Sequence, residues 1–311
     1  MRVVQLQDPA EVRGWNLTTA PRPVPGEGEL LIEVSAAAVT PTELLWYPTL
    51  QTKSGAPRTN VILGHEFSGV IVATGRSVTG WDKGQDVFGM NDWFADGATA
   101  EYCLAPYSAV APKPRTLTHA EAATVPISAL TAWQGLIDRA KLQPGERVLV
   151  HGGGGAVGIF AVQLAKLHEA HVTATASERD LRFVTSLGAD AVIDHRASRF
   201  EDEAQELDVV FDTVGGETMQ RSWSVLRPGG RMVTVAATEE AVTDDRTKAA
   251  FFIVEPNRKQ LGEIGALFDA HRLRTFVGAT VPFSQAPEAY SGRIAKQGPG
   301  KVVVELGGVS V

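Results

Sequence analysis

The sequence predicts an α/β protein with a doubly wound parallel sheet and a second, β-rich domain. Three observations support this prediction. In residues 148–166, VLVHGGGGAVGIFAVQLAK, a glycine-rich loop joins an apolar run to a helical segment. Apolar, strand-like runs then alternate with helical segments, as in a parallel sheet. Residues 1–122 instead contain short strand-like runs separated by glycine and proline clusters, which is typical of a β-rich domain.

The glycine-rich loop has the spacing of a dinucleotide-binding loop. Gly152, Gly155 and Gly158 form a G-x-x-G-x-x-G pattern directly after the apolar run 148–150. Such glycines permit a tight turn and let backbone N–H groups approach a pyrophosphate, which lies at the positive end of the following helix. Residues 156–166 have the composition and apolar spacing of that helix. A flexible loop is the alternative, but the flanking strand and helix favour a nucleotide.

The segments after the loop complete the pattern of a parallel sheet. Residues 170–177 are predicted as a second strand, which ends about 20 residues past the glycines, where the ribose-reading residue of such units belongs. A helix begins in the polar segment 177–180 and ends at Leu187-Gly188. Further strand-like runs follow at 191–195, 207–216 and 229–237. This alternation predicts a Rossmann-type sheet.

The remaining segments predict the second domain and its connection to the first. The N-terminal part contains strand-like runs at 28–39, 67–75 and 100–106. A helix is predicted at 119–140, directly before the nucleotide-binding unit. After that unit, the tail contains a strand-like run at 275–283, a short helix at 286–291 and a last strand-like run at 300–306.

Composition limits the classes of function. With 311 residues, 44% of them hydrophobic, the chain is long enough for two cores. The net charge of −7 argues against a nucleic-acid or anionic-membrane partner. Cys103 is the only cysteine, which excludes an internal disulfide and fits a reducing compartment. The N-terminus resembles a strand rather than a signal peptide, and no apolar run approaches about 18 residues, so we expect a cytoplasmic protein.

Several segments carry a resemblance to a known family: GHEFSGVIVATG (64–75), VPISALTAWQGL (125–136), HGGGGAVGIFAVQLAK (151–166), LGADAVIDHR (187–196) and GKVVVEL (300–306). The chain resembles the medium-chain dehydrogenase/reductase superfamily and, within it, the zinc-free quinone oxidoreductase branch related to zeta-crystallin. The resemblance implies a GroES-like catalytic domain in residues 1–122 and 272–311 and a Rossmann dinucleotide-binding domain in residues 123–271. It also implies a homodimer formed through the nucleotide-binding domain.

The residues that bind zinc in other members of the superfamily are missing. Zinc needs three or four ligands at defined spacing. In zinc members a cysteine follows the second β-run, where this chain has Thr40. A second cysteine has no counterpart in 125–136, and the four-cysteine lobe is absent because Cys103 stands alone. Since His65 and Glu66 cannot form a site by themselves, we interpret His65 as a hydrogen-bonded structural residue and expect no metal.

The expected absence of zinc constrains the reaction that the resemblance implies. A zinc ion would act as a Lewis acid on an alkoxide or carbonyl. Without it, hydride delivery stays feasible to an acceptor that spreads its own negative charge, such as a quinone or an α,β-unsaturated carbonyl. We therefore expect an NADPH-dependent reductase of a quinone or another conjugated carbonyl. One alternative is a 2-alkenal or enone double-bond reductase, and another is a non-catalytic NADPH-binding protein that resembles a crystallin or a sensor.

Two hydroxyl groups are the predicted catalytic contacts with the acceptor. The zinc-free branch often has an Asn-Pro-x-Asp element where this chain has the sequence Thr-Pro-Thr-Glu at 40–43, so the asparagine role does not carry over directly. Thr40 keeps a hydroxyl that faces the nicotinamide by analogy, and Tyr47 is the nearest phenol. Trp46 is a candidate wall for an aromatic acceptor. The alternative is that Trp46 and Tyr47 only pack the rim of the pocket.

The end of the second strand predicts a preference for NADPH over NADH. Thr175 occupies the position of the ribose-reading residue and carries no charge that would repel a 2′-phosphate. Ser177 and Arg179 supply a hydroxyl and a guanidinium that suit this phosphate. Glu178 either points to solvent or weakens the preference. The alternative is that Arg179 and Arg196 are solvated surface charges.

The resemblance adds further cofactor contacts. Thr131 resembles a position close to the nicotinamide ribose, although its hydroxyl could instead bond to its own helix backbone. The predicted NADPH-binding residues are Thr131, Gly152, Gly155, Ala156, Val157, Gly158, Ser177, Arg179, His195, Arg196, Val214, Ala236 and Phe252.

Overall fold

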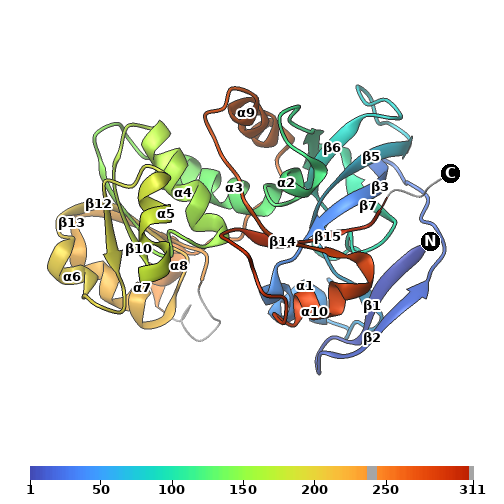
Figure 1. Ribbon diagram of the computed structural model, residues 1–311, viewed down its shortest axis with the longest axis horizontal. Helices are drawn as coiled ribbons and strands as arrows, with labels where there is room; N and C mark the ends of the chain where they lie inside the picture. Colours follow the sequence, from blue (N-terminus) through green and yellow to red (C-terminus); the bar gives the residue numbers. More distant parts are fainter. Residues whose placement is uncertain (237–243, 308–311) are drawn as a thin grey trace. The chain divides into compact units, whose positions relative to one another are not determined.

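The computed structural model describes residues 1–236 and 244–307 of the 311-residue chain. The chain divides into two compact units (Figure 1). Unit 1 comprises Met1–Ile127 and Pro256–Val311, and unit 2 comprises Ser128–Glu255. Each unit has its own hydrophobic core, and the two are described separately.

Unit 2 is built on a parallel sheet with the strand order β11-β10-β9-β12-β13. Every neighbouring pair in this sheet is parallel. The central position of β9 makes the strand order reverse there, which is the switch point of a doubly wound sheet. These observations confirm the predicted α/β fold class. The strands are β9 (Arg147–Val150), β10 (His171–Ala176), β11 (Ala191–Asp194), β12 (Leu207–Asp212) and β13 (Leu226–Thr234).

The helices of unit 2 connect these strands. All six residues of β12 are buried, as expected for a strand that is covered on both faces. The core around it includes Leu149, Phe200 and Val210. The helical segments between the strands are α4 (Ala156–Leu167), η4 (Glu178–Asp180), α5 (Leu181–Ser186), α6 (Phe200–Glu203), α7 (Gly216–Ser222) and η5 (Trp223–Val225), and α8 (Asp245–Ala250) follows the last strand.

The helix predicted at 119–140 is interrupted. The structure has α2 (His119–Ala123), α3 (Pro126–Trp133) and a π-helical segment, η3 (Gln134–Arg139). A capping box formed by Thr118 and Glu121 starts α2. Pro126 begins a new helix because proline lacks the N–H that would continue the preceding one. The prediction of one continuous helix was therefore wrong.

Unit 1 contains a seven-stranded sheet and a three-stranded sheet. The larger sheet has the order β14-β15-β3-β5-β6-β8, and β7 also pairs with β3. The smaller sheet has the order β2-β1-β4. The strands are β1 (Arg2–Asp8), β2 (Arg13–Thr19), β3 (Glu29–Ala38), β4 (Val61–Ile62), β5 (Glu66–Thr74), β6 (Asp86–Met90), β7 (Tyr102–Pro106), β8 (Val110–Pro112), β14 (Val277–Pro282) and β15 (Lys301–Glu305).

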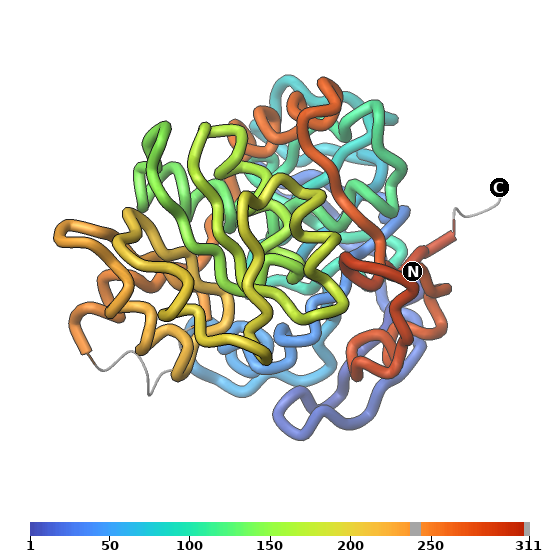
Figure 2. Tube along the Cα trace, turned by 60° about the vertical axis from the view of Figure 1, so that its left-hand side comes forward, coloured from blue at the N-terminus to red at the C-terminus, as the bar shows by residue number. Residues whose placement is uncertain are grey.

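The tail of the chain completes the larger sheet of unit 1. The last described strand, β15, pairs antiparallel with β3, and Val304 lies opposite Ala37 in this register. In Figure 2 the C-terminal part of unit 1 (red) lies beside its N-terminal part (blue). The core of unit 1 therefore combines residues from both ends of the chain, among them Phe67 and Tyr290. Short helical segments cover its ends: η1 (Pro41–Leu45), α1 (Tyr47–Leu50), η2 (Tyr107–Ala109), η7 (Phe283–Gln285) and α10 (Ala286–Tyr290).

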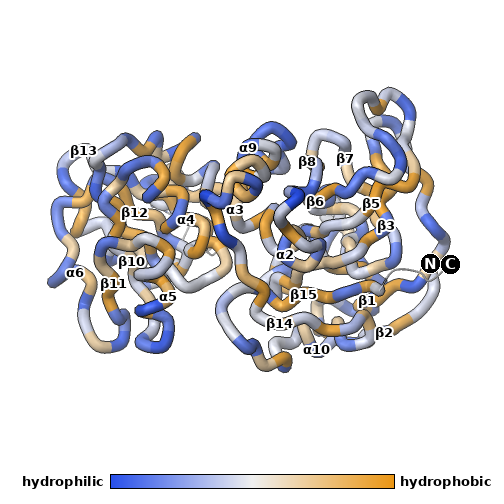
Figure 3. Tube along the Cα trace, turned by 45° about the horizontal axis from the view of Figure 1, so that its top comes forward, coloured by the Kyte–Doolittle hydropathy of each residue, from blue (hydrophilic) through white to orange (hydrophobic). Residues whose placement is uncertain are grey.

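The unit boundaries differ from the predicted domain boundaries at 122/123 and 271/272. Helix α9 (Arg258–Asp269) belongs to unit 1, although the prediction placed it in the nucleotide-binding domain. Its apolar residues alternate with polar ones (Figure 3), and the apolar side includes buried Leu261 and Phe268. Gly265 of α9 lies against Pro114 and Phe88 of unit 1.

Among the described residues, no helix combines the length and apolar character that crossing a membrane requires.

Candidate functional site

The glycine loop of unit 2 is held in a conformation that needs glycine. Gly152 has a φ of +74°, and its N–H donates to Oγ1 of Thr175 over 3.1 Å. The N–H of Gly153 donates to the carbonyl of Thr175 over 2.8 Å, which fixes the loop to β10. A Cβ at Gly158 would lie 2.1 Å from the carbonyl oxygen of Gly152. The first turn of α4 therefore packs directly on the loop.

This geometry fits the pyrophosphate of a dinucleotide. Gly155 is the N-cap of α4, and no side chain caps the helix there. The N–H groups of the first helical turn lack partners within the helix, so they are available to an anion. The predicted residues Gly152, Gly155 and Gly158 are thus brought together with Ala156 and Val157 in one cradle.

The buried side chain of His151 bonds to the same threonine as the glycine loop. Nε2 of His151 lies 2.9 Å from Oγ of Ser222, whose own proton goes to the carbonyl of Thr218, so Nε2 donates. Nδ1 lies 3.2 Å from Oγ1 of Thr175 and accepts from it. Burial lowers the pKa of His151 to about 4, and the carboxylate of Asp212 opposes that shift. The ring is therefore neutral at neutral pH.

A buried carboxylate organises the ends of β12 and β13. Asp212 accepts from the N–H groups of Val214 and Gly215 and from the hydroxyl of Thr234, over 3.0, 3.1 and 2.7 Å. Thr234 in turn accepts from the N–H of Ala236 over 3.2 Å. Two predicted cofactor residues, Val214 and Ala236, are thus positioned by one residue at the carboxyl edge of the sheet, where ligands of such sheets bind.

The end of β10 presents an arrangement with a carboxylate that the sequence analysis did not include. Oγ of Ser177 donates to Oδ2 of Asp180 over 2.7 Å. Nε of Arg179 lies 3.3 Å from the same oxygen. His195, after β11, bonds through Nδ1 to the carbonyl of Ala176 over 2.8 Å. Ser177 and Arg179 therefore share an internal anion, and their role at a 2′-phosphate stays a prediction.

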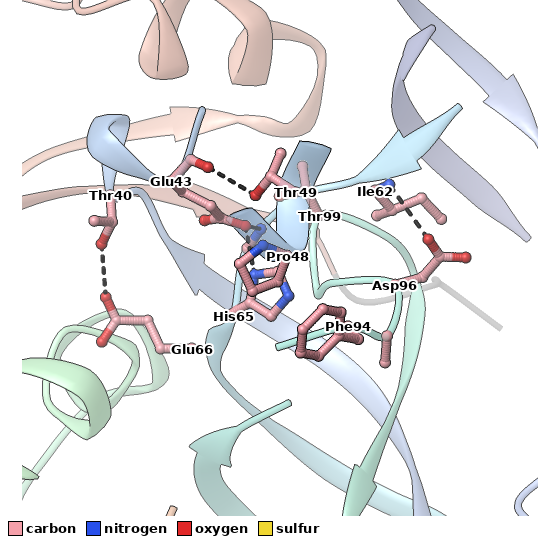
Figure 4. A network of polar contacts seen from close by, with 12 residues as sticks. Thr40, Glu43, Pro48, Thr49, Ile62, His65, Glu66, Phe94, Asp96 and Thr99 are labelled. Carbon is pink, nitrogen blue, oxygen red and sulfur yellow. Dashed lines mark hydrogen bonds and ion pairs between the residues drawn. The ribbon is translucent and has the colours of Figure 1, made fainter. Parts of the chain in front are cut away.

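In unit 1, the predicted catalytic threonine joins a buried network of charges (Figure 4). Oγ1 of Thr40 donates to Oε1 of Glu66 over 3.4 Å. The same carboxylate forms an ion pair with Lys301, and its second oxygen accepts from the N–H of Ile127 over 3.1 Å. Glu66 and Lys301 are both buried. Thr40 is half-buried, and its hydroxyl is directed into this ion-paired network.

The second part of the network is a carboxylate–imidazole pair. Nδ1 of His65 lies 2.5 Å from Oε1 of Glu43, and that oxygen also accepts from the N–H of Gly64 over 2.9 Å (Figure 4). Both side chains are buried. The rings of Trp46 and Trp93 pack near His65, with centroids 6.4 and 5.5 Å away. His65 is hydrogen-bonded, as the sequence analysis predicted.

Comparison with known proteins places the chain in a family. A model described as "Alcohol dehydrogenase GroES-like domain" matches residues 26–115, and one described as "Zinc-binding dehydrogenase" matches residues 187–304. A 2-methylene-furan-3-one reductase of Solanum lycopersicum is 31% identical over 319 residues, which cover 95% of this chain and 79% of that protein. A chloroplastic NADPH-dependent alkenal/one oxidoreductase of Arabidopsis thaliana is 32% identical over 289 residues, covering 89% and 72%.

The solved structure of the quinone oxidoreductase from Coxiella burnetii has the same fold. It superposes with a TM-score of 0.87 at 27% identity and covers 98% of this chain and 99% of that chain. The chain belongs to the medium-chain dehydrogenase/reductase superfamily. Within it, the chain is similar to the quinone oxidoreductase branch, and its β-rich domain is GroES-like.

In this medium-chain dehydrogenase/reductase, the two predicted catalytic residues have different environments. Tyr47 is 48% exposed, and its ring packs against Phe94 at 6.1 Å. Thr40 is directed instead to Glu66. Thr40 donates its hydroxyl proton to Glu66 and not to Tyr47. The structure therefore places Tyr47, and not Thr40, with its hydroxyl outside the buried network.

The other predicted cofactor residues of this superfamily member lie in unit 2. Thr131 is buried in α3. Phe252 is buried, and the guanidinium of Arg139 lies 4.7 Å from the centre of its ring. Arg179 and Arg196 are exposed.

The thiol and carboxylate groups do not gather into a metal-binding set. Across residues 1–236 and 244–307, no three His, Cys, Asp or Glu residues are placed to hold one metal ion. Burial in β7 raises the pKa of the Cys103 thiol to about 12.

Sequence reasoning missed four residues that organise these sites: His151, Asp180, Asp212 and Lys301. Two of them carried a signal. Asp212 is a charged residue at the end of an otherwise apolar run, and Lys301 directly precedes the apolar run 302–304. A charge in such a run is retained when a partner or a turn needs it. His151 and Asp180 gave no comparable pattern.

Proposed function

We propose that this protein is an NADPH-dependent reductase that delivers hydride to a quinone or another conjugated carbonyl without zinc. The polar groups around Thr40 are the observation that carries the proposal. The hydroxyl of Thr40 bonds to Glu66, Glu66 pairs with Lys301, and His65 bonds to Glu43. Each charged group in this set thus has a polar partner, and none of the groups is a thiolate. An acceptor that stabilises its own negative charge suits such a site better than a simple alcohol does.

The dinucleotide is proposed to bind in unit 2. The glycine cradle would hold the pyrophosphate, and the residues after β12 and β13 would lie along the nicotinamide half. Bound NADPH supplies the hydride. The proposed roles of Thr131, Ser177, Arg179, His195, Arg196 and Phe252 remain those given by the sequence analysis. Names of relatives that include "NADPH-dependent" and "quinone oxidoreductase" support this cofactor and this class of acceptor.

The acceptor is proposed to lie beside the aromatic residues of unit 1. Trp46 and Trp93 are 5.1 Å apart at an interplanar angle of 87°, which gives an apolar wall. Tyr47 offers the hydroxyl for a developing oxyanion, because its side chain is half exposed. Placement of the acceptor and one hydrogen bond are then the main contributions of the protein.

A second candidate is the reduction of an enone or 2-alkenal double bond. The names of the Solanum and Arabidopsis relatives favour it. The hydride step is shared, so the two candidates differ in the acceptor that fits.

An acceptor panel tests both candidates. NADPH oxidation is measured with one quinone and one enone, and NADP⁺ reduction is measured with ethanol. The zinc content of the purified protein is measured in parallel. We expect turnover with a conjugated acceptor, almost none with NADP⁺ and ethanol, and no stoichiometric zinc. Efficient ethanol oxidation, or zinc whose removal abolishes activity, would reject the proposal. Tight NADPH binding without turnover of any acceptor would favour a non-catalytic role.

We also propose a cytoplasmic homodimer in which unit 1 is the catalytic domain and unit 2 binds the dinucleotide. The single cysteine fits a reducing compartment. Light scattering after size-exclusion chromatography tests the dimer, and cell fractionation tests the compartment.

A further inference from the structure

The carboxylate of Asp180 lies in the segment 177–180, where the sequence predicts the groups that bind the 2′-phosphate of NADPH. This segment lies at the end of β10, beside the glycine loop. A Cβ built on Gly154 would lie 3.2 Å from Cβ of Asp180 and 3.5 Å from its Oδ2. Asp180 therefore packs against the loop that would hold the dinucleotide. Its side chain is only 27% exposed.

Both groups that suit a 2′-phosphate already bind this carboxylate. Ser177 has one hydroxyl proton, and it is directed to Oδ2 of Asp180 over 2.7 Å. Nε of Arg179 lies 3.3 Å from the same oxygen, although the Arg179 side chain is 87% exposed and can turn away. The internal carboxylate thus takes the interactions that a phosphate oxygen would make. A 2′-phosphate must displace these bonds and also bear the repulsion of a nearby negative charge.

The carboxylate of Asp180 would not repel NADH, which has no 2′-phosphate. Its ribose carries a 2′-hydroxyl, which can donate to a carboxylate. The remaining charges near this edge are Glu178, which is exposed, Asp194 at the end of β11, and the exposed Arg196. His195 already uses Nδ1 for the carbonyl of Ala176. Asp180 is the one carboxylate of this group that both packs on the glycine loop and binds Ser177.

We infer that Asp180 is a cofactor-specificity residue that competes with the 2′-phosphate for Ser177 and Arg179. It thereby reduces the difference between the affinities for NADPH and NADH that these two residues would otherwise create. The inference rests on the proposed dinucleotide site. It predicts that Asp180→Asn strengthens the binding of NADPH, because it removes the negative charge and leaves Ser177 bonded to a neutral amide oxygen, which holds its hydroxyl less strongly than a carboxylate does. NADH should bind equally well or more weakly, because the amide oxygen is the weaker acceptor for its 2′-hydroxyl.

Calorimetric titration of the full chain tests the inference. The ligands are NADPH, NADH and two fragments without nicotinamide, 2′,5′-ADP and 5′-ADP. We expect Asp180→Asn to lower the dissociation constants of NADPH and 2′,5′-ADP by on the order of tenfold. Those of NADH and 5′-ADP should not fall. Asp202→Asn removes the same charge from an exposed position of α6 and should leave all four constants unchanged.

The outcomes separate this inference from the proposed function. If the wild type binds neither dinucleotide, the proposed function fails, and the two ADP fragments still test Asp180. If the wild type binds both and Asp180→Asn behaves like Asp202→Asn, the inference fails while the proposed function stands. Asp180 makes no capping hydrogen bond to α5, so Asp180→Asn should fold, and Asp180→Ser provides a second variant. Ser177→Ala should weaken NADPH binding more in the Asp180→Asn background than in the wild type.

Discussion

At the residue scale, the two hydroxyls proposed for the acceptor site differ in what they can offer. The proton of Thr40 is directed to Glu66, inside a network that already pairs its charges. Tyr47 is half exposed, and its ring, not its hydroxyl, packs against Phe94. Tyr47 is therefore the more suitable donor to an oxygen that becomes negative during hydride transfer.

Tyr47→Phe removes this hydroxyl and keeps the ring that packs on Phe94. We expect kcat/KM to fall about tenfold for a quinone, and by more for an enone, whose enolate is the poorer anion and needs the donor more. Steady-state kinetics on one acceptor of each class gives the result. An equal loss for both acceptors would show that Tyr47 only lines the pocket.

The neutral state of His151 predicts how stability depends on pH. An unfolded histidine binds its proton as the pH falls below about 6.5, whereas native His151 does so only near pH 4. The unfolded state thus holds more protons in this range, so the free energy of unfolding falls as the pH falls. The full loss is on the order of 3 kcal/mol at pH 4.

Urea unfolding between pH 4.5 and 7.5 measures this slope. His151→Gln should make it shallower, and His271→Gln, at an exposed site, should leave it unchanged. Burial also lowers the pKa of His119 and His168, so part of the slope will remain. A slope in His151→Gln as steep as in the wild type would contradict the assignment.

At the element scale, the contact between α4 and the glycine loop decides whether the cradle can form. In Gly158→Ala the new Cβ would lie 2.1 Å from the carbonyl oxygen of Gly152, so the loop or the helix must shift. Overpacking of this kind costs about 1–3 kcal/mol, or roughly a five- to 150-fold weaker NADPH affinity if the shift is felt at the cradle.

Gly262→Ala is the matched control, because nothing lies within 4 Å of a Cβ built at that position of α9. It should leave NADPH binding unchanged and stabilise the helix by about 0.5–1 kcal/mol. Calorimetry and thermal unfolding of both variants give the comparison. Unchanged NADPH affinity in Gly158→Ala would show that the cradle is not the cofactor site.

Elements were predictable where their signal is local. The glycine loop, the helix after it and the five strands of the parallel sheet follow from runs of adjacent residues. The structure has these elements at nearly the predicted positions. The break at Pro126 was also visible in the sequence, but the apolar pattern on both sides of it suggested one helix. The packing of α9 near Phe88 and Pro114 is a tertiary contact, which no local pattern in the sequence specifies.

The buried charge network was not predictable for the same reason. Glu66 and Lys301 are 235 residues apart in the chain, and His65 and Glu43 are 22 residues apart. Nothing in the sequence near either partner specifies the other. The glycine cradle of unit 2 was therefore easier to predict from the sequence than the proposed acceptor site of unit 1.

At the scale of the whole molecule, unit 1 depends on both ends of the chain. Its sheet has the order β15-β3-β5, so Lys301 of β15 and Glu66 of β5 come from strands on either side of β3. Burial removes water from both charges, and each compensates the other. The ion pair therefore links the tail to the strand that carries the proposed acceptor network.

Lys301→Met should destabilise the protein more than a surface substitution of the same kind. It leaves Glu66 buried with the Thr40 hydroxyl and the Ile127 N–H as its partners among the described residues, and breaking a buried ion pair on one side costs about 3–5 kcal/mol. Glu66→Gln combined with Lys301→Met should recover part of this loss, because no uncompensated charge remains. Urea unfolding of the two variants, with Lys259→Met on the exposed side of α9 as control, measures the difference. If Lys301→Met costs no more than Lys259→Met, the ion pair does not stabilise the closure of unit 1 by the tail.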